Sequence, residues 1–208
     1  KHGIARVHDS YAAVFADPDV DAVYNPLPNS HHKGLTIQAL QAGKHVLVEK
    51  PIAANADDAR AMRDAATASG KVLMEAFHWR YHPLTQRVLD DVQRLGRLKS
   101  VRTSMCVPFL KPDDIRFDFA LAGGALMDTG CYAVNMARTF AGVAGTTRRL
   151  LVDDASPILT AKDPRVDRAF RAQLHSEDGS CAVFVHCSLL SSTLFAISRW
   201  SGPLMIGR

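Results

Sequence analysis

The chain has 208 residues, 47% hydrophobic and 22% charged, which is enough apolar content to bury the core of one large domain or two small ones. Its formal net charge of +4 comes from Lys and Arg scattered among acids, which argues against a nucleic-acid partner, and no apolar run reaches the roughly 18 residues of a membrane span. Four cysteines without a C-x-x-C pair make no disulfide framework, so we expect a reduced, cytoplasmic protein.

The first part of the chain alternates short strands with helices. Residues 20–24 predict a strand, which the prolines of residues 26–30 end as a loop. The apolar spacing over residues 31–42 predicts a helix, and Gly43 follows where a helix C-cap is expected. Residues 45–48 form a nearly unbroken apolar run, which is typical of a strand buried on both faces of a parallel sheet.

The same pattern then repeats once. Asn55 is the expected cap of a second helix, which Gly70 closes, and residues 72–76 predict a third strand. Strand, helix, strand, helix, strand at this spacing predicts a βαβαβ unit with right-handed crossovers. Such a unit is half of a Rossmann fold.

Beyond residue 77 the pattern changes. Pro83 suits the first position of a helix that runs to about Leu95, and residues 98–107 predict a longer strand. Gly123-Gly124 then introduces a helix over residues 125–140. Later segments alternate polar and apolar residues and predict a mostly antiparallel sheet, with strands at 148–152, 166–175, 181–190 and 194–200.

The predicted fold is therefore α/β plus α+β in two domains. Residues 1–77 are expected to form the second half of a Rossmann domain. Residues 78–208 are expected to form an incomplete, mostly antiparallel, open-faced sheet with helices on one side.

Unusual residues follow each of the three predicted strands of the first domain. They lie in residues 25–32, 49–51 and 77–80, which carry prolines, Lys50, Trp79 and an arginine. Because ligands bind beyond the carboxyl ends of the strands in an open parallel sheet, three such loops at one edge predict a pocket. Each also has a plainer interpretation: Trp79 in a core, Lys50 as a solvated loop charge, and the prolines as turns.

Three motifs occur in order along the chain. Residues 25–51 begin N-P-L-P-N-S-H-H and end V-L-V-E-K-P, residues 74–83 read M-E-A-F-H-W-R-Y-H-P, and residues 123–132 read G-G-A-L-M-D-T-G-C-Y. Together they resemble the glucose–fructose oxidoreductase, inositol dehydrogenase and rhizopine-catabolism (Gfo/Idh/MocA) family. The likeness is greatest to its subgroup of dimeric dihydrodiol dehydrogenases and pentose dehydrogenases.

The resemblance implies an NAD(P)-dependent oxidoreductase. Its expected cofactor is NADP or NAD, and its expected substrate is a sugar, polyol or dihydrodiol whose hydroxyl-bearing carbon exchanges a hydride with the nicotinamide. The resemblance also implies that the protein forms a homodimer or a higher homo-oligomer. The alternatives are a non-catalytic regulator of the same fold that senses a dinucleotide or a sugar, and a nonfunctional fragment.

The resemblance also implies roles for individual residues. Lys50 matches a lysine beside the nicotinamide ribose, Asp128 matches an aspartate that orients substrate or lysine, and Tyr132 falls where many members carry a histidine acid/base. A free phenol has a pKa near 10, so a neighbouring ammonium group is the physical reason to pair Tyr132 with Lys50. Asp128 and Tyr132 are four positions apart and would share one face of an α-helix. The expected cofactor-binding residues are Pro26, Leu27, Asn29, His32, Glu49, Lys50, Trp79 and Arg80.

No metal site is predicted. His78 and His82 are four apart, but no Glu follows His78 and Pro83 interrupts the helix that an H-E-x-x-H site requires. His32 is instead expected to cap the helix that follows it or to face the pocket.

The glycine fingerprint G-x-G-x-x-G occurs nowhere in the sequence. Relatives of this type carry it in a strand-helix-strand unit that precedes the segment matched by this chain. The resemblance therefore implies a chain truncated at both ends.

Overall fold

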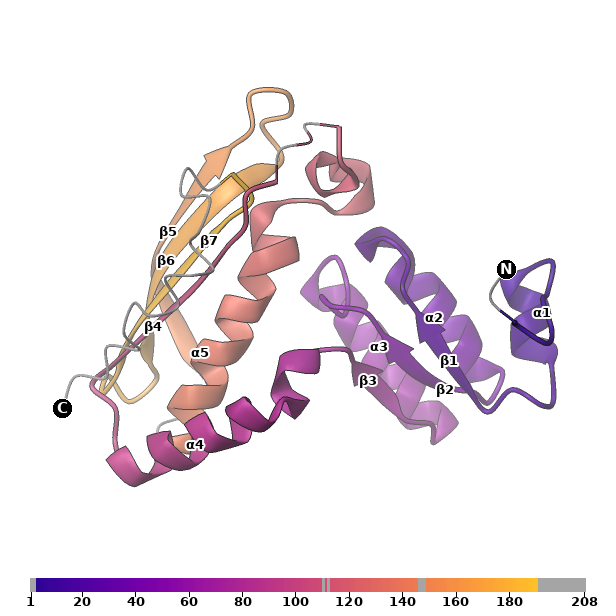
Figure 1. Cartoon of the computed structure of the whole chain (residues 1–208), viewed down its shortest axis with the longest axis horizontal. Coiled ribbons are helices and arrows are strands. Elements are labelled where there is room, and N and C mark those ends of the chain that lie inside the picture. The colour runs from indigo at the N-terminus through magenta and orange to yellow at the C-terminus, as the bar shows by residue number, and fades with distance from the viewer. Residues whose placement is uncertain (1–2, 110, 112, 146–148, 191–208) are drawn as a thin grey trace. The chain divides into compact units, whose positions relative to one another are not determined.

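The structure is a computed structural model that describes residues 3–109, 111, 113–145 and 149–190. It divides between Ala76 and Phe77 into two compact units (Figure 1). Among the described residues, no helix has both the length and the apolar character needed to cross a membrane.

The first unit contains a parallel three-stranded sheet in the order β1-β2-β3. Its strands are β1 (Ala22–Asn25), β2 (His45–Val48) and β3 (Leu73–Glu75), and the crossovers are the helices α2 (His32–Gln41) and α3 (Ala56–Ser69). A short helix, α1 (Tyr11–Ala16), precedes the sheet. The predicted βαβαβ unit is confirmed.

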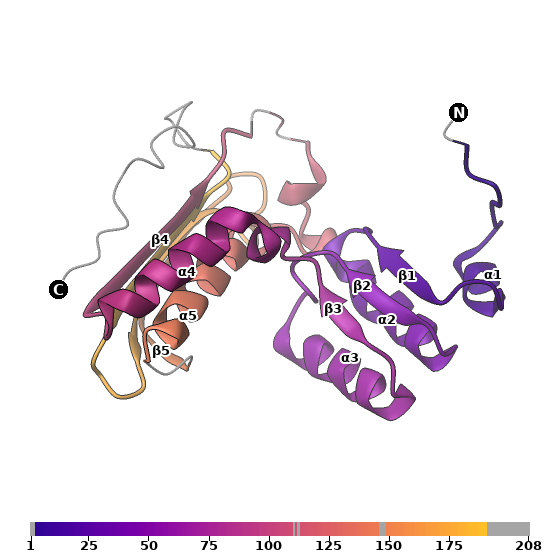
Figure 2. The same ribbon diagram turned by 60° about the horizontal axis from the view of Figure 1, so that its bottom comes forward.

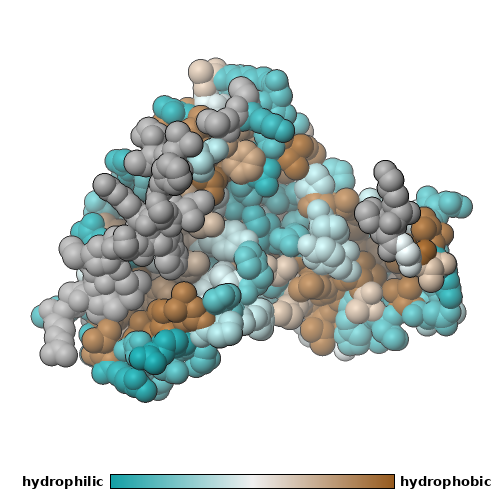
Figure 3. Space-filling view, viewed as in Figure 1, coloured by the Kyte–Doolittle hydropathy of each residue, from teal (hydrophilic) through white to brown (hydrophobic). Residues whose placement is uncertain are grey.

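In the described part of the chain, helices cover one face of this sheet and leave the other open (Figure 2). Val46 and Val48 of β2 are buried in a core with residues of α2 and α3, whereas Leu47 and Met74 are each 37% exposed. Apolar side chains are therefore visible on the surface over these strands (Figure 3). The prediction that β2 is buried on both faces was wrong, because two right-handed crossovers that step in the same direction place both helices on the same side.

The strand register brings the ends of the three strands to one edge. Asn25 pairs with Val48, and Val48 pairs with Glu75. All three residues are the last of their strands, so the loops that follow β1 and β2 begin side by side.

The second unit is a four-stranded sheet in the order β4-β7-β6-β5, with helices α4 and α5. Two pairings are antiparallel and the β4–β7 pairing is parallel, so the sheet is mixed. Its elements are α4 (Pro83–Leu95), β4 (Ser100–Cys106), α5 (Cys131–Val143), β5 (Leu150–Leu159), β6 (Asp167–Ser176) and β7 (Ala182–Ser188).

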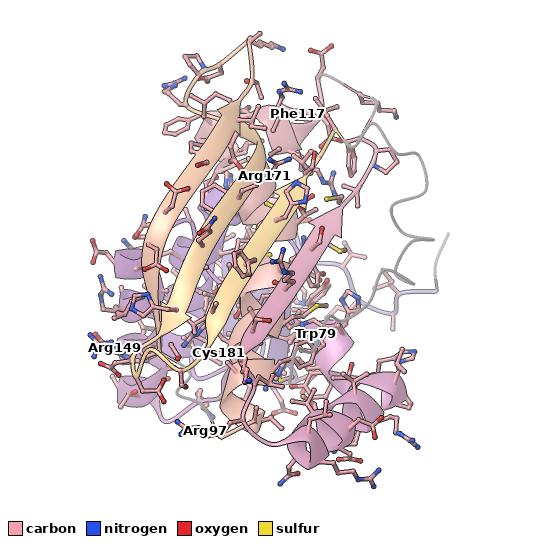
Figure 4. All side chains as sticks on the ribbon, turned by 90° about the vertical axis from the view of Figure 1, so that its left-hand side faces the viewer. Trp79, Arg97, Phe117, Arg149, Arg171 and Cys181 are labelled. Atoms are coloured by element: carbon pink, nitrogen blue, oxygen red, sulfur yellow. The ribbon has the colours of Figure 1, made fainter. Side chains whose placement is uncertain are left out.

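Helix α5 packs on one face of this second sheet. Ala133 and Ala137 of the helix are fully buried in a core with Val101, Val183 and Val185 of the strands. The opposite face carries polar side chains such as Arg171 (Figure 4). Sheet and helix thus form a two-layer support for the residues at the start of α5.

Two predicted elements of this unit differ from the structure, and a third lies outside the described residues. The strand predicted at 148–152 is β5, which runs on to Leu159 and is the last strand of the sheet formed by the described residues, where Pro157 does not interrupt a central ladder. The helix predicted over 125–140 begins with a π-helical segment, Leu126–Gly130, before α5. The strand predicted at 194–200 lies outside the described residues.

Candidate active site

The loop after β1 is held by a buried amide. The Nδ2 atom of Asn25 lies 3.3 Å from Oγ1 of Thr36 on α2, and its Oδ1 accepts the backbone N–H of Leu27 at 3.3 Å. The carbonyl of Pro28 accepts the N–H of His31 at 2.8 Å, which turns the chain into α2. The loop conformation is therefore fixed by local hydrogen bonds.

His32 lies behind this loop and not at its surface. The side chain is 0% exposed, its Nε2 lies 2.7 Å from the carbonyl oxygen of Leu27, and its Nδ1 lies 2.9 Å from that of Pro51. It is the first residue of α2 and not the cap. The loop surface is formed instead by Pro26, which is exposed, and by Leu27 and Asn29, which are half-buried.

Lys50 lies in the loop Glu49-Lys50-Pro51, whose backbone is held by hydrogen bonds before and after the lysine. Its backbone N–H donates to Oε2 of Glu49 at 3.1 Å, and the peptide bond to Pro51 is cis. The N–H of Ile52 donates to Oε1 of Glu75, the last residue of β3, at 2.8 Å. Lys50 is half-buried, so its side chain starts from a well-defined backbone and still reaches solvent.

Glu49 also accepts a hydrogen bond from the open face of the sheet. The hydroxyl of Tyr24 donates to Oε1 of Glu49 at 2.7 Å. That hydrogen bond, together with burial and the negative charge of Glu49, raises the pKa of Tyr24. Both oxygens of Glu49 are therefore engaged by the chain.

Tyr132 lies in the second unit, in the first turn of α5. It is only 8% exposed, and its ring packs edge-on against Phe77 with 5.4 Å between ring centroids. Its hydroxyl lies 3.5 Å from Nδ1 of His78. The phenol thus has an aromatic neighbour that excludes water and an imidazole that can exchange a proton with it.

Asp128 lies in the π-helical segment and pairs with Arg116. The Oδ2 atom of Asp128 is 2.8 Å from Nε of Arg116, whose guanidinium also contacts Asp114 and stacks 4.3 Å from the ring centroid of Phe109. Burial lowers the pKa of Arg116, but the two carboxylates outweigh it and the net direction is upward. Arg116 was not among the residues predicted from the sequence, because an arginine in a loop 12 positions before Asp128 gives no sequence signal of this pairing.

Trp79 and Arg80 lie close to α5. The ring of Trp79 packs edge-on against Phe140, and its Nε1 is buried without a hydrogen-bond partner among the described residues. A guanidinium nitrogen of Arg80 lies 3.3 Å from Oγ1 of Thr139. The predicted site residues thus fall into two groups, one on the loops of the first unit and one along α5, with Tyr132 at the start of that helix and Trp79 and Arg80 against its last turns. Within the described parts of the chain, no cluster of three or more His, Cys, Asp or Glu side chains is placed to bind a metal ion.

Two family models match the chain. The model described as "Oxidoreductase family, NAD-binding Rossmann fold" matches residues 1–77, and the model described as "GFO/IDH/MocA C-terminal domain" matches residues 85–194. Together they cover both units of the structure.

Characterised relatives include sugar and diol dehydrogenases. D-xylose 1-dehydrogenase (NADP(+)) 2 of Haloferax volcanii is 41% identical over 184 residues, which are 86% of this chain and 54% of that protein. Trans-1,2-dihydrobenzene-1,2-diol dehydrogenase of Xenopus laevis is 35% identical over 136 residues, 64% of this chain and 41% of that protein. The chain therefore spans about half the length, or less, of these relatives.

Solved structures show the same likeness. An aldose-aldose oxidoreductase from Caulobacter crescentus in complex with glycerol superposes with a TM-score of 0.77 at 31% identity, over 86% of this chain and 54% of that one. A variant of a 3-ketoreductase from Actinomadura kijaniata, in complex with TDP-benzene and NADP, superposes with a TM-score of 0.79 at 30% identity, over 88% and 55%.

Proposed function

This chain belongs to the Gfo/Idh/MocA oxidoreductase family, and from that premise we propose that it is the site-bearing part of an NAD(P)-dependent dehydrogenase or reductase. Its substrate is proposed to be a sugar, a polyol or a dihydrodiol. The relatives named above act on substrates of these kinds or carry NADP in their structures. Because the chain spans about half the length of its relatives, the proposal concerns the product of the complete gene.

The observation that carries this proposal is the fixed loop that bears Lys50. Its backbone is held by Glu49, Glu75 and the ring of His32, and it starts at the carboxyl edge of a parallel sheet. That edge is where open α/β sheets bind dinucleotides. A half-buried lysine on a structured loop at this edge suits the ribose and nicotinamide end of such a cofactor. The residues proposed to hold the cofactor are Pro26, Leu27, Asn29, Glu49, Lys50, Trp79 and Arg80.

A bound nicotinamide supplies the acceptor for the hydride that leaves the substrate carbon. The chain must supply the rest, above all a group that takes the hydroxyl proton as the hydride departs. We assign that step to the phenol oxygen of Tyr132. Its neighbour His78 can relay the proton toward solvent, because His78 is exposed and its Nδ1 is 3.5 Å from the hydroxyl.

Lys50 and Asp128 are proposed to tune and orient this step. The ammonium group of Lys50 favours the charged form of a nearby phenol and so makes Tyr132 a better base. Asp128, held by Arg116 at 2.8 Å, is a fixed acceptor for a substrate hydroxyl. Hydroxyl-rich substrates such as sugars suit an acceptor of this kind.

We also propose that the protein works as a homo-oligomer in the cytoplasm. The four cysteines are free, which suits a reducing compartment. The face of the second sheet opposite α5 has no helix over it in the described structure, which leaves room for a second subunit (Figure 4).

The test is turnover by the complete gene product with NADP⁺ or NAD⁺ and a panel of pentoses, hexoses and a trans-dihydrodiol, followed by the absorbance of the reduced nicotinamide. Lys50→Ala and Tyr132→Phe are each expected to lower kcat by about 100-fold or more, as for loss of an acid/base group. Lys33→Ala on α2 and Tyr11→Phe on α1 are matched controls expected to keep wild-type kcat. Dinucleotide binding without turnover by the wild type would favour the sensing regulator instead.

A further inference from the structure

Asp167, the first residue of β6, caps the helical segment that carries Asp128. The Oδ2 atom of Asp167 accepts the backbone N–H of Leu126 at 2.8 Å. Burial raises the pKa of this carboxyl, while the N–H groups of Leu126 and Ala125 act in the opposite direction. The first N–H groups of a helix have no partner within it, and a carboxylate is the acceptor that suits them best.

Two glycines allow this close approach. Gly124 has a φ of +123°, and a Cβ atom there would overlap Oδ1 of Asp167. A Cβ atom on Gly123 would lie 2.5 Å from the carbonyl oxygen of Arg116, whose backbone accepts the N–H of Gly124 at 2.8 Å. Because neither glycine has a side chain, the carboxylate of Asp167 and the backbone of Arg116 can both pack against the Gly123-Gly124 turn.

The far end of the segment is held as tightly. A Cβ atom on Gly130 would lie 2.8 Å from Sγ of Cys187 on β7 and 2.9 Å from Cδ1 of Leu126. The π-helical segment Leu126–Gly130 is therefore fixed at its start by β6 and at its end by β7. Single π-helical turns are rare and are frequently found at functional sites.

Both proposed catalytic groups of this unit depend on that segment. Asp128 lies within it, and Tyr132 follows Gly130 by two residues in the first turn of α5. A rotation of the segment would carry the Asp128 carboxylate away from Arg116 and the Tyr132 hydroxyl away from His78. The only charged side chain that the described structure places on the segment's first N–H groups is Asp167.

We propose that Asp167 is a positioning residue that sets the directions of Asp128 and Tyr132 through the capped π-helical segment. The kinetic part of this proposal rests on the proposed function. Its structural part does not, because the ring position of Tyr132 is measurable without substrate.

The experiment compares Asp167→Asn and Asp167→Ala with Asp178→Asn in the complete gene product. Asp178 is the matched control: it is also an acceptor of several hydrogen bonds, from Ser176 and Ser180, but lies beyond the opposite end of β6. Ring signals of ¹³C-labelled tyrosine, assigned with Tyr132→Phe, report the surroundings of Tyr132 in the absence of substrate. Urea unfolding of each variant reports its stability.

We expect both Asp167 variants to displace the Tyr132 signals, and Asp178→Asn to leave them in place at a similar loss of stability. With a substrate, kcat should fall by about 10-fold to 100-fold for Asp167→Ala, as for a small misplacement of reacting groups, while KM for the dinucleotide stays within about twofold. Asp167→Asn keeps the shape of the side chain and one acceptor oxygen, so this variant should fold, and its kcat should fall less than that of Asp167→Ala. Unmoved Tyr132 signals in both Asp167 variants overturn the proposal, whether or not the wild type shows turnover. Absence of wild-type turnover with displaced signals overturns only the proposed function.

Discussion

Nδ1 of His32 lies 2.9 Å from the carbonyl oxygen of Pro51, and the same ring places Nε2 2.7 Å from the carbonyl oxygen of Leu27. A neutral imidazole has one N–H and a protonated one has two. Only a protonated ring can donate to both carbonyls. Either way, one buried side chain joins the loop after β1 to the loop that bears Lys50.

Removal of the His32 ring is expected to loosen both loops together. His32→Ala should lower the free energy of unfolding by about 2–4 kcal/mol, because it leaves a cavity and at least one buried carbonyl without a donor. It should also raise KM for the dinucleotide more than His31→Ala, which alters an exposed ring on the neighbouring residue. Urea unfolding and initial-rate kinetics measure the two effects. Equal values for both variants would contradict the assigned role.

Substitutions at Trp79 and at its partner ring distinguish a role of Trp79 in stability from a role in cofactor binding. In Trp79→Phe the smaller ring loses packing, but the buried indole N–H that has no partner among the described residues is removed with it. The two effects oppose each other, so the free energy of unfolding should change by less than about 1 kcal/mol. If Trp79 contacts the cofactor as proposed, KM for the dinucleotide should rise several-fold. Phe140→Leu, which changes the partner ring, should instead lower stability and leave that KM unchanged.

Two glycines should respond to the same substitution with opposite signs. Gly124→Ala places a Cβ atom against the carboxylate of Asp167 in a left-handed backbone conformation, and should destabilise the protein by about 2 kcal/mol or more. Gly34 lies inside α2 with no atom within 4 Å of its added Cβ. Gly34→Ala should stabilise by about 0.5–1 kcal/mol, the difference in helix propensity. Thermal unfolding of both variants measures the signs, and destabilisation by both would contradict this account.

The raised pKa of the Cys187 thiol predicts that the protein loses stability at alkaline pH. Burial, with the charge of Asp167 as a smaller cause, raises the pKa of the Cys187 thiol from 9.0 to about 12. Between those values the unfolded chain releases this proton and the folded chain keeps it, so rising pH favours unfolding across that window. Cys187→Ser lacks the ionisation and should show a shallower decline in urea midpoint than the wild type. Equal slopes for the wild type and Cys187→Ser would rule out the assignment.

Elements with local signals in the sequence could be predicted closely. Asn55 caps α3 by accepting the N–H of Asp58, Gly70 ends that helix in the left-handed conformation, and Pro83 is the first residue of α4. Each of these signals lies within a few residues of the boundary that it sets. The three motifs were sufficient to predict the family as well.

Features that depend on distant residues could not be predicted. The open face at Leu47 follows from the direction of two crossovers, and the close approach of Gly130 to Cys187 on β7 joins residues from distant parts of the sequence. The link between Asp167 and Leu126 spans 41 positions, and an isolated aspartate at the start of a strand gives no sequence signal of such a role. The predicted roles of Lys50 and Tyr132 stay predictions, because the two residues belong to different units.

Isotope transfer tests the central proposal most directly. D-xylose deuterated at its anomeric carbon, or another panel sugar deuterated at its reacting carbon, is incubated with the complete gene product and NADP⁺, and the reduced dinucleotide is analysed by mass spectrometry. The account predicts one deuterium in the reduced dinucleotide with the wild type, and none above background with Lys50→Ala or Tyr132→Phe. Reduced dinucleotide without deuterium, or equal transfer by all three proteins, would contradict it.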